Sequence, residues 1–109
     1  MDRSLGARLA RHPIIATLYG AEQIDSFVDS ASEIAIVANV ELRRLQAVVA
    51  TITRADKIAI VNIDSCEGIS PDKGGVEYLA EIGATSLVST RVATIQRANR
   101  AGLLTMQKV

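Results

Sequence analysis

Ile58-Ala59-Ile60-Val61-Asn62-Ile63 is the stretch that decides the fold, because it is apolar at almost every position and ends in a polar turn. A strand with one wet face alternates apolar and polar residues, whereas a strand of a parallel sheet is buried on both faces and is apolar throughout. Beyond the turn, residues 76–82 predict a short helix, and Gly83 suits the position just past its end. The stretch therefore predicts a strand of a parallel sheet that is followed by a helical crossover.

The same pairing of apolar run and helix recurs on both sides of this stretch. The other apolar runs are residues 13–18, 34–38, 86–89 and 103–106. The segments with helical spacing are residues 21–30, 40–55 and 91–100. We expect Asn39 to be the N-cap of the second helix. In the last helix we expect Val92, Ile95 and either Ala98 or Asn99 to face the core, with Gly102 as its end.

The resulting order βαβαβαβαβ fits two architectures. Five strands match an open flavodoxin-like sheet of this length. Such a sheet normally closes with a helix after its last strand, and only Gln107, Lys108 and Val109 follow residues 103–106. We therefore expect a parallel (βα)4β segment, about half of a (β/α)8 barrel, and keep the open flavodoxin-like sheet as the alternative. Residues 1–12 are expected to be a lead-in and residues 13–109 a partial barrel, together forming a single α/β domain.

Composition excludes several classes of function. The chain has 109 residues, a formal net charge of zero and 3% aromatic residues, so it offers neither a stacking ladder for single-stranded bases nor a uniformly basic surface. Cys66 is its only cysteine, which excludes an intramolecular disulfide and a cysteine pair for zinc. No apolar run approaches the roughly 20 residues that span a bilayer, and no leader signature is present. We expect a soluble, cytoplasmic protein without a membrane partner.

Charge is distributed unevenly along the chain. Residues 21–81 carry 11 of the 12 acidic side chains, whereas residues 82–109 carry none. The basic side chains of that last segment are Arg91, Arg97, Arg100 and Lys108. This asymmetry is either ordinary decoration of helix surfaces or the mark of a segment that faces an anion, such as a phosphate or an RNA backbone.

Polar residues gather where the predicted strands end, which is where parallel α/β folds bind ligands. Asp64 follows the third strand, and a carboxylate there either accepts ligand hydroxyls, coordinates a metal or braces its loop. Asp64 and Glu67 alone are too small a cluster to indicate Mg²⁺. Ser89-Thr90-Arg91 follows the fourth strand at the start of a helix. It either presents backbone N–H groups and a guanidinium to an anion, or holds a Thr90 cap and a solvated Arg91.

No motif indicates an enzyme. The chain lacks both GxGxxG and a P-loop. Its one histidine, His12, precedes the first strand and therefore lies at the opposite end of the sheet from Cys66. A catalytic cysteine–histidine pair is not credible.

The order of these segments is similar to that of the glycerol-3-phosphate-responsive antiterminators, the glycerol-uptake operon antiterminator regulators. The resemblance extends over about residues 12–109. The segments that carry it are residues 13–16, 62–70, Asp72, residues 75–79, residues 86–91, and Gln107-Lys108. In the family these strands end in His-x-Asp-Leu, Ile-Ser-Thr-Arg and Gln-Arg.

The resemblance implies a (β/α)8-type barrel and a non-catalytic regulator. Such a regulator senses glycerol 3-phosphate, uses no other cofactor or metal, and acts on the leader mRNA of a glycerol-catabolism operon. The ligand-binding residues it implies are Asn62, Asp64, Gly68, Ser89, Thr90, Arg91, Gln107 and Lys108. Arg97 and Arg100 are weaker candidates for RNA contact. The alternatives are an enzyme on a related fold that binds a phosphorylated small molecule, and an inactive fragment.

Four departures from the family pattern matter. The family's histidine at the end of the third strand is Asn62, the arginine of its Gln-Arg is Lys108, and its basic position at the first strand is Leu18-Tyr19. The fourth is length, because the family continues through strands six to eight. A half-barrel leaves two strand edges and a wet, apolar inner face. We therefore expect a homo-oligomer that associates through the open edges.

Overall fold

A five-stranded parallel sheet organises the chain. The computed structural model describes residue 10 and residues 15–107. Its strands are β1 (Ile15–Tyr19), β2 (Ile34–Ala38), β3 (Ile58–Asn62), β4 (Ser86–Ser89) and β5 (Leu104–Gln107). The connecting helices are the 3₁₀ turn η1 (Ala21–Gln23), α2 (Ile24–Val28), α3 (Leu42–Arg54), α4 (Lys73–Glu81) and α5 (Val92–Arg100). Each predicted strand and helix is present within the described residues, with most ends shifted by a few residues; residues 13 and 14 of the first predicted strand, and the expected lead-in apart from residue 10, lie outside the described residues.

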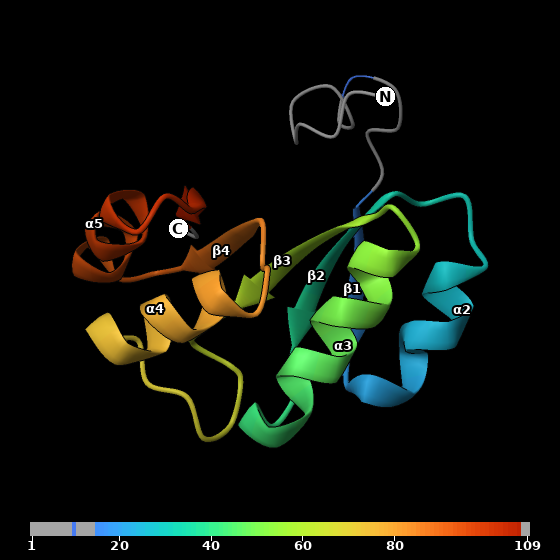
Figure 1. Cartoon of the computed structure of the whole chain (residues 1–109), viewed down its shortest axis with the longest axis horizontal. Coiled ribbons are helices and arrows are strands. Elements are labelled where there is room, and N and C mark those ends of the chain that lie inside the picture. The colour runs from blue at the N-terminus through green and yellow to red at the C-terminus, as the bar shows by residue number, and fades with distance from the viewer. Residues whose placement is uncertain (1–9, 11–14, 108–109) are drawn as a thin grey trace.

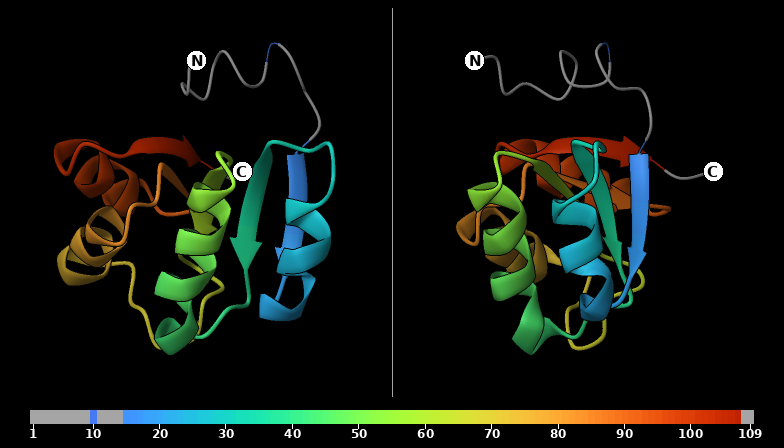
Figure 2. Two further views of the ribbon diagram at one scale, coloured as in Figure 1. Left: turned by 45° about the vertical axis from the view of Figure 1, so that its right-hand side comes forward. Right: turned by 90° about the vertical axis from the view of Figure 1, so that its right-hand side faces the viewer.

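The strand order decides between the two expected architectures. The sheet runs β1-β2-β3-β4-β5, so each strand pairs with its neighbour in sequence, and all four pairs are parallel. The helices lie on one face of the sheet, and the strands turn steadily from β1 to β5 (Figures 1 and 2). An open doubly wound sheet reverses its strand order and carries helices on both faces. Sequential order with helices on one face is the barrel arrangement, so the half-barrel prediction is confirmed and the flavodoxin-like alternative is wrong.

The main core lies between the sheet and the helices. Val37 and Val61 from the sheet pack there with Leu45 and Ile52 of α3 and Leu79 of α4, and all five side chains are fully buried. The helix predicted over residues 40–55 therefore buries one apolar stripe, formed by Leu45, Val48, Val49 and Ile52. Burying one such side chain contributes about 1.5–3 kcal/mol, so this layer dominates the stability of the domain.

The face without helices forms a second, smaller cluster. Ile34, Ile58, Ile60 and Val88 are buried on it, and Ile36 packs against them. The expectation of a wet inner face is wrong for these side chains, because curvature of the sheet brings the large isoleucines of neighbouring strands together. The expectation is met at the margins, where Tyr19 is 62% and Leu104 is 50% exposed.

Two helix starts differ from their prediction. Asn39 has φ 57°, in the left-handed region, and the N-cap of α3 is Glu41, which makes no side-chain capping bond. The N–H of Leu42 instead donates to the backbone oxygen of Glu67 at 2.7 Å, so a neighbouring loop caps the helix. In α5, Ala98 faces inward as expected. Val92 is 56% exposed, however, and Thr94 takes the buried position.

Candidate functional site at the carboxyl ends of the third and fourth strands

Asp64 organises the polar groups at the ends of β3 and β4. Its carboxylate accepts hydrogen bonds from the Ser89 hydroxyl at 3.0 Å, the Thr90 backbone N–H at 2.8 Å and the Thr90 hydroxyl at 3.2 Å. The Arg91 Nε lies 3.9 Å from Asp64 Oδ1. Parallel pairing of β3 with β4 brings the two strand ends side by side, which explains why residues 25 or more apart in sequence meet here.

The donors at the start of α5 remain available. Thr90 does not cap the helix; the N-cap is Arg91, whose side chain makes no capping bond. The Arg91 N–H donates to the Ser89 hydroxyl at 3.0 Å. The Arg91 side chain is 67% exposed and that of Asp64 is 23% exposed. A helix N-terminus beside a guanidinium attracts an anion, and a carboxylate with spare lone pairs accepts hydroxyls.

Asn62 joins this cluster from the end of β3. Its Oδ1 accepts a hydrogen bond from the Asp64 N–H at 3.2 Å, which fixes the turn that carries the carboxylate. The next residue along the turn, Ser65, accepts a hydrogen bond from the Asn39 N–H at 3.2 Å through its hydroxyl oxygen. The loop after β3 therefore connects the end of β2 to the end of β4.

Gly68 is placed differently from the other candidates. It has φ +90°, and a Cβ there would lie 3.0 Å from the Cβ of Leu42 at the start of α3. A glycine is required because the loop passes close to that helix with a left-handed backbone. No contact found among the described residues joins Gly68 to the Asp64 cluster.

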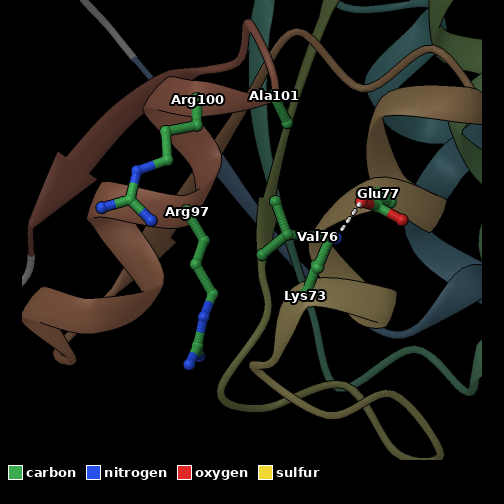
Figure 3. A pocket seen from close by; sticks show the side chains of 6 residues that line it. All are labelled: Lys73, Val76, Glu77, Arg97, Arg100 and Ala101. Carbon is green, nitrogen blue, oxygen red and sulfur yellow. Dashed lines mark ion pairs between the residues drawn. The ribbon is translucent and has the colours of Figure 1, made fainter.

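The remaining candidates lie on β5, beyond it, or on α5. The backbone of Gln107 is in register with Ser89, next to the cluster. Lys108 lies outside the described residues, as does His12. Arg97 and Arg100 lie away from the strand ends, in a groove of about 400 Å³ between α4 and α5 (Figure 3).

The far end of the loop after β3 makes contacts that sequence reasoning missed. The carbonyl oxygen of Pro71 accepts a hydrogen bond from the buried Thr94 hydroxyl at 2.9 Å and from Arg97 Nη1 at 3.4 Å. Asp72 caps α4 by accepting from the Gly75 N–H at 2.9 Å. The cap had a signal in the sequence, an Asp just before a helix. The link from Pro71 to α5 had none, because it joins residues 23 and 26 apart through space.

Cys66 belongs to the packing of this loop. Its side chain is 5% exposed, and burial raises the pKa of the thiol above its usual range. A thiol held protonated is a poor nucleophile. Among the residues that the structure describes, no group of three His, Cys, Asp or Glu side chains is arranged to hold a metal ion. No helix within the same residues is long and apolar enough to cross a bilayer.

Comparisons with known proteins identify the family. The family model described as "Glycerol-3-phosphate responsive antiterminator" matches residues 14–109. The chain is also similar to a crystal structure described as the glycerol uptake operon antiterminator regulatory protein from Listeria monocytogenes str. 4b F2365. That match has a TM-score of 0.80 and 19% sequence identity; it covers 85% of this chain and 51% of the other. The curated proteins gave no match.

The structural match supports the barrel-type fold, and this chain spans about half the length of the matched protein. The family match extends over nearly the whole sequence, including every strand described above. The chain belongs to the family of glycerol-3-phosphate responsive antiterminators.

Proposed function

We propose that the chain is the glycerol 3-phosphate-sensing part of an antitermination regulator, with its effector site at the carboxyl ends of β3 and β4. The observation that carries this proposal is the Asp64 cluster, which combines an uncapped helix start, an exposed guanidinium and a carboxylate. It occurs in a family whose name states this effector. The regulator binds its effector without chemical turnover and acts in the cytoplasm.

The chemistry of glycerol 3-phosphate matches the two kinds of group in the cluster. Its phosphate pairs with the Arg91 guanidinium and the N–H groups of the first turn of α5. Its hydroxyls donate to Asp64. The Ser89 hydroxyl lies 3.0 Å from both carboxylate oxygens, and Oδ2 also accepts from both groups of Thr90, so Oδ1 keeps the greater lone-pair capacity. Asn62, Gly68, Gln107 and Lys108 complete the set of proposed ligand-binding residues.

The output of the regulator is proposed to be contact with the leader mRNA of a glycerol-catabolism operon. Arg97 and Arg100 supply the basic surface for this contact, and both side chains are exposed on α5. We also propose self-association through the exposed edges of the sheet, where Leu104 of β5 and Tyr19 of β1 lie.

Isothermal titration calorimetry tests the effector site. We expect saturable binding of glycerol 3-phosphate with a Kd of about 1 mM or tighter, a free energy of roughly 4 kcal/mol or more. Glycerol has only the hydroxyls that Asp64 would accept, and inorganic phosphate has only the group that Arg91 would bind. Each should therefore bind at least tenfold more weakly than glycerol 3-phosphate. Arg91→Ala should weaken binding at least tenfold. Arg54→Ala, which removes an exposed arginine at the last turn of α3, should leave it unchanged.

Two results would contradict the proposal. One is an absence of saturable heat with glycerol 3-phosphate. The other is binding that Arg91→Ala and Arg54→Ala weaken equally, because a site held by general surface charge does not distinguish the two arginines.

A further inference from the structure

The groove between α4 and α5 has walls of different composition (Figure 3). Lys73, Val76 and Glu77 line it from α4, and Arg97 and Arg100 line it from α5, with Ala101 just beyond that helix. It has a volume of about 400 Å³ and lies on the helical face. It is therefore separate from the cluster at the strand ends.

Positive charge dominates the groove. Three cations line it against one carboxylate, that of Glu77. This carboxylate already lies 3.9 Å from the ammonium of Lys73, which precedes it by one helical turn. Both side chains are more than half exposed, so the pair is weak and opens readily when a stronger anion approaches.

The positions of the arginines favour an extended anion over a compact one. Arg97 and Arg100 are three residues apart and lie on the same face of α5, yet their side chains run in different directions, Arg97 along the groove and Arg100 away from it (Figure 3). In that arrangement the two guanidinium groups do not converge on one point. A chain of phosphates meets them one after the other.

The described lining of the groove has no aromatic platform on which bases could stack. Its uncharged lining is Val76 and Ala101, and no aromatic side chain lines it. Stacking on aromatic rings is the usual way in which proteins hold single-stranded bases. This lining therefore favours contact with backbone phosphates, which the cations Lys73, Arg97 and Arg100 can pair with whatever the base sequence.

We propose that the groove between α4 and α5 binds the phosphate backbone of RNA, with Lys73 on one wall and Arg97 and Arg100 on the other. The choice of RNA rests on the proposed function, whereas the choice of surface and the role of Lys73 rest on the groove itself. Lys73 is new to the set of RNA-contacting residues. Glu77 acts against binding, because its carboxylate both repels phosphate and occupies Lys73.

The groove is tied to the effector cluster through one loop. That loop holds Asp64 at its start and Pro71 near its end, and the Pro71 carbonyl accepts a hydrogen bond from Arg97. The hydroxyl of Thr94, a buried residue of the same helix, donates a hydrogen bond to the same carbonyl oxygen. A ligand that shifts Asp64 can therefore act on Arg97 through the loop to Pro71 and then through the hydrogen bonds that Pro71 accepts from Thr94 and Arg97.

Fluorescence anisotropy with a labelled 20-nucleotide oligouridylate tests the groove. Binding should weaken steeply as salt rises, and the slope of log K against log salt should fall by about 0.7 for each phosphate contact removed. Lys73→Ala, Arg97→Ala and Arg100→Ala should each weaken binding and flatten that slope. Glu77→Gln should instead tighten binding by about two- to fivefold, the scale of one exposed charge. Arg54→Ala is the matched control and should change nothing beyond a general charge effect.

Three results would overturn the proposal. The oligonucleotide fails to bind; it binds equally well to the groove variants and to Arg54→Ala; or polyglutamate displaces it at equal charge concentration, which would indicate an acidic protein partner. Circular dichroism shows whether each variant is folded, and exposed positions such as Lys73 should tolerate alanine. Calorimetry with glycerol 3-phosphate on the same variants separates this outcome from the effector proposal, because a wrong groove leaves Arg91-dependent effector binding intact.

Discussion

The two ends of the parallel sheet are built differently. At the amino end, three helices run into the next strand through the same short turn. The residues in the left-handed region are Asp56 after α3, Gly83 after α4 and Gly102 after α5. In each turn two backbone N–H groups donate hydrogen bonds to carbonyl oxygens of the preceding helix. After α4, for example, the Gly83 N–H donates to the Ala80 oxygen at 3.2 Å and the Ala84 N–H donates to the Leu79 oxygen at 3.1 Å. This is the Schellman arrangement, which leaves few polar groups for a ligand.

At the carboxyl end the connections are longer and their polar groups are only partly used. The loop from Ile63 to Asp72 satisfies its own backbone through side chains such as Asn62 and Ser65. It leaves the Arg91 side chain mostly exposed and the start of α5 without a side-chain cap. In barrels the amino ends of the strands typically contribute to stability, whereas the loops at their carboxyl ends bind ligands. Substitutions at the two ends should therefore have separable effects.

Lys57→Met at the amino end should have the largest effect on stability. The Lys57 ammonium donates to the carbonyl oxygens of Phe27 at 3.0 Å, Ser30 at 2.8 Å and Ser32 at 2.7 Å, and lies 4.7 Å from the centre of the Phe27 ring. Losing this donor should lower the free energy of unfolding by about 2–4 kcal/mol, with affinity for glycerol 3-phosphate unchanged. Urea unfolding at fixed protein concentration measures it. Lys73→Met, which alters a side chain 83% exposed, is the control and should stay within about 0.5 kcal/mol of the parent.

Asp64→Ala at the carboxyl end should have its main effect on affinity for glycerol 3-phosphate and only a smaller effect on stability. It removes the acceptor for Ser89 and Thr90, so the effector cluster loses its shape and its hydroxyl acceptor. Affinity for glycerol 3-phosphate should fall at least tenfold, while stability should fall by about 1–3 kcal/mol, because Thr90 is exposed to water but the buried Ser89 hydroxyl loses its acceptor. Calorimetry and urea unfolding on one preparation give both numbers. A variant that loses stability yet keeps full affinity would show that Asp64 is not part of the effector site.

Gly83→Ala should lower stability by about 1 kcal/mol without touching effector binding. Gly83 has φ +92°, and a Cβ there would meet nothing within 4 Å, so the cost comes from the backbone alone. Gly74→Ala is the matched control. Gly74 lies in α4 without a positive φ, and alanine there should raise stability by about 0.5–1 kcal/mol. Thermal unfolding should show the two opposite signs.

Cys66 should give the smallest effect, visible only at alkaline pH. Burial raises the pKa of its thiol in the folded state, so unfolding releases a proton once the pH passes the ordinary thiol value. This contribution to stability is complete below that value and is lost as the pH rises through the folded-state pKa. Urea midpoints between pH 7.5 and 10 should therefore fall more for the parent than for Cys66→Ala. Parallel curves would show that the thiol is not held protonated.

Sequence patterns predicted the order of strands and helices well, because continuous apolar runs and helical spacing are local signals. They also placed Asp64 and residues 89–91 at one edge, since parallel strands align their carboxyl ends. They were wrong about Asn39 and Val92, because contacts from the loop after β3 reach the starts of both helices, at Leu42 and at Thr94. Lys57 gave no signal at all, because its partners lie 25 to 30 residues away. Burial of the inner isoleucines depends on sheet curvature, which a single strand does not encode.

The most direct test of the effector site is a ¹⁵N–¹H NMR titration of the chain with glycerol 3-phosphate, followed at both ends of the sheet. A site at the carboxyl ends of β3 and β4 should shift the amide signals of Asp64, Ser89, Thr90 and Arg91, and leave those of Asp56, Gly83 and Gly102 unshifted. Signals that stay fixed throughout, or that shift chiefly at the three amino-end turns, would contradict the placement of the effector site.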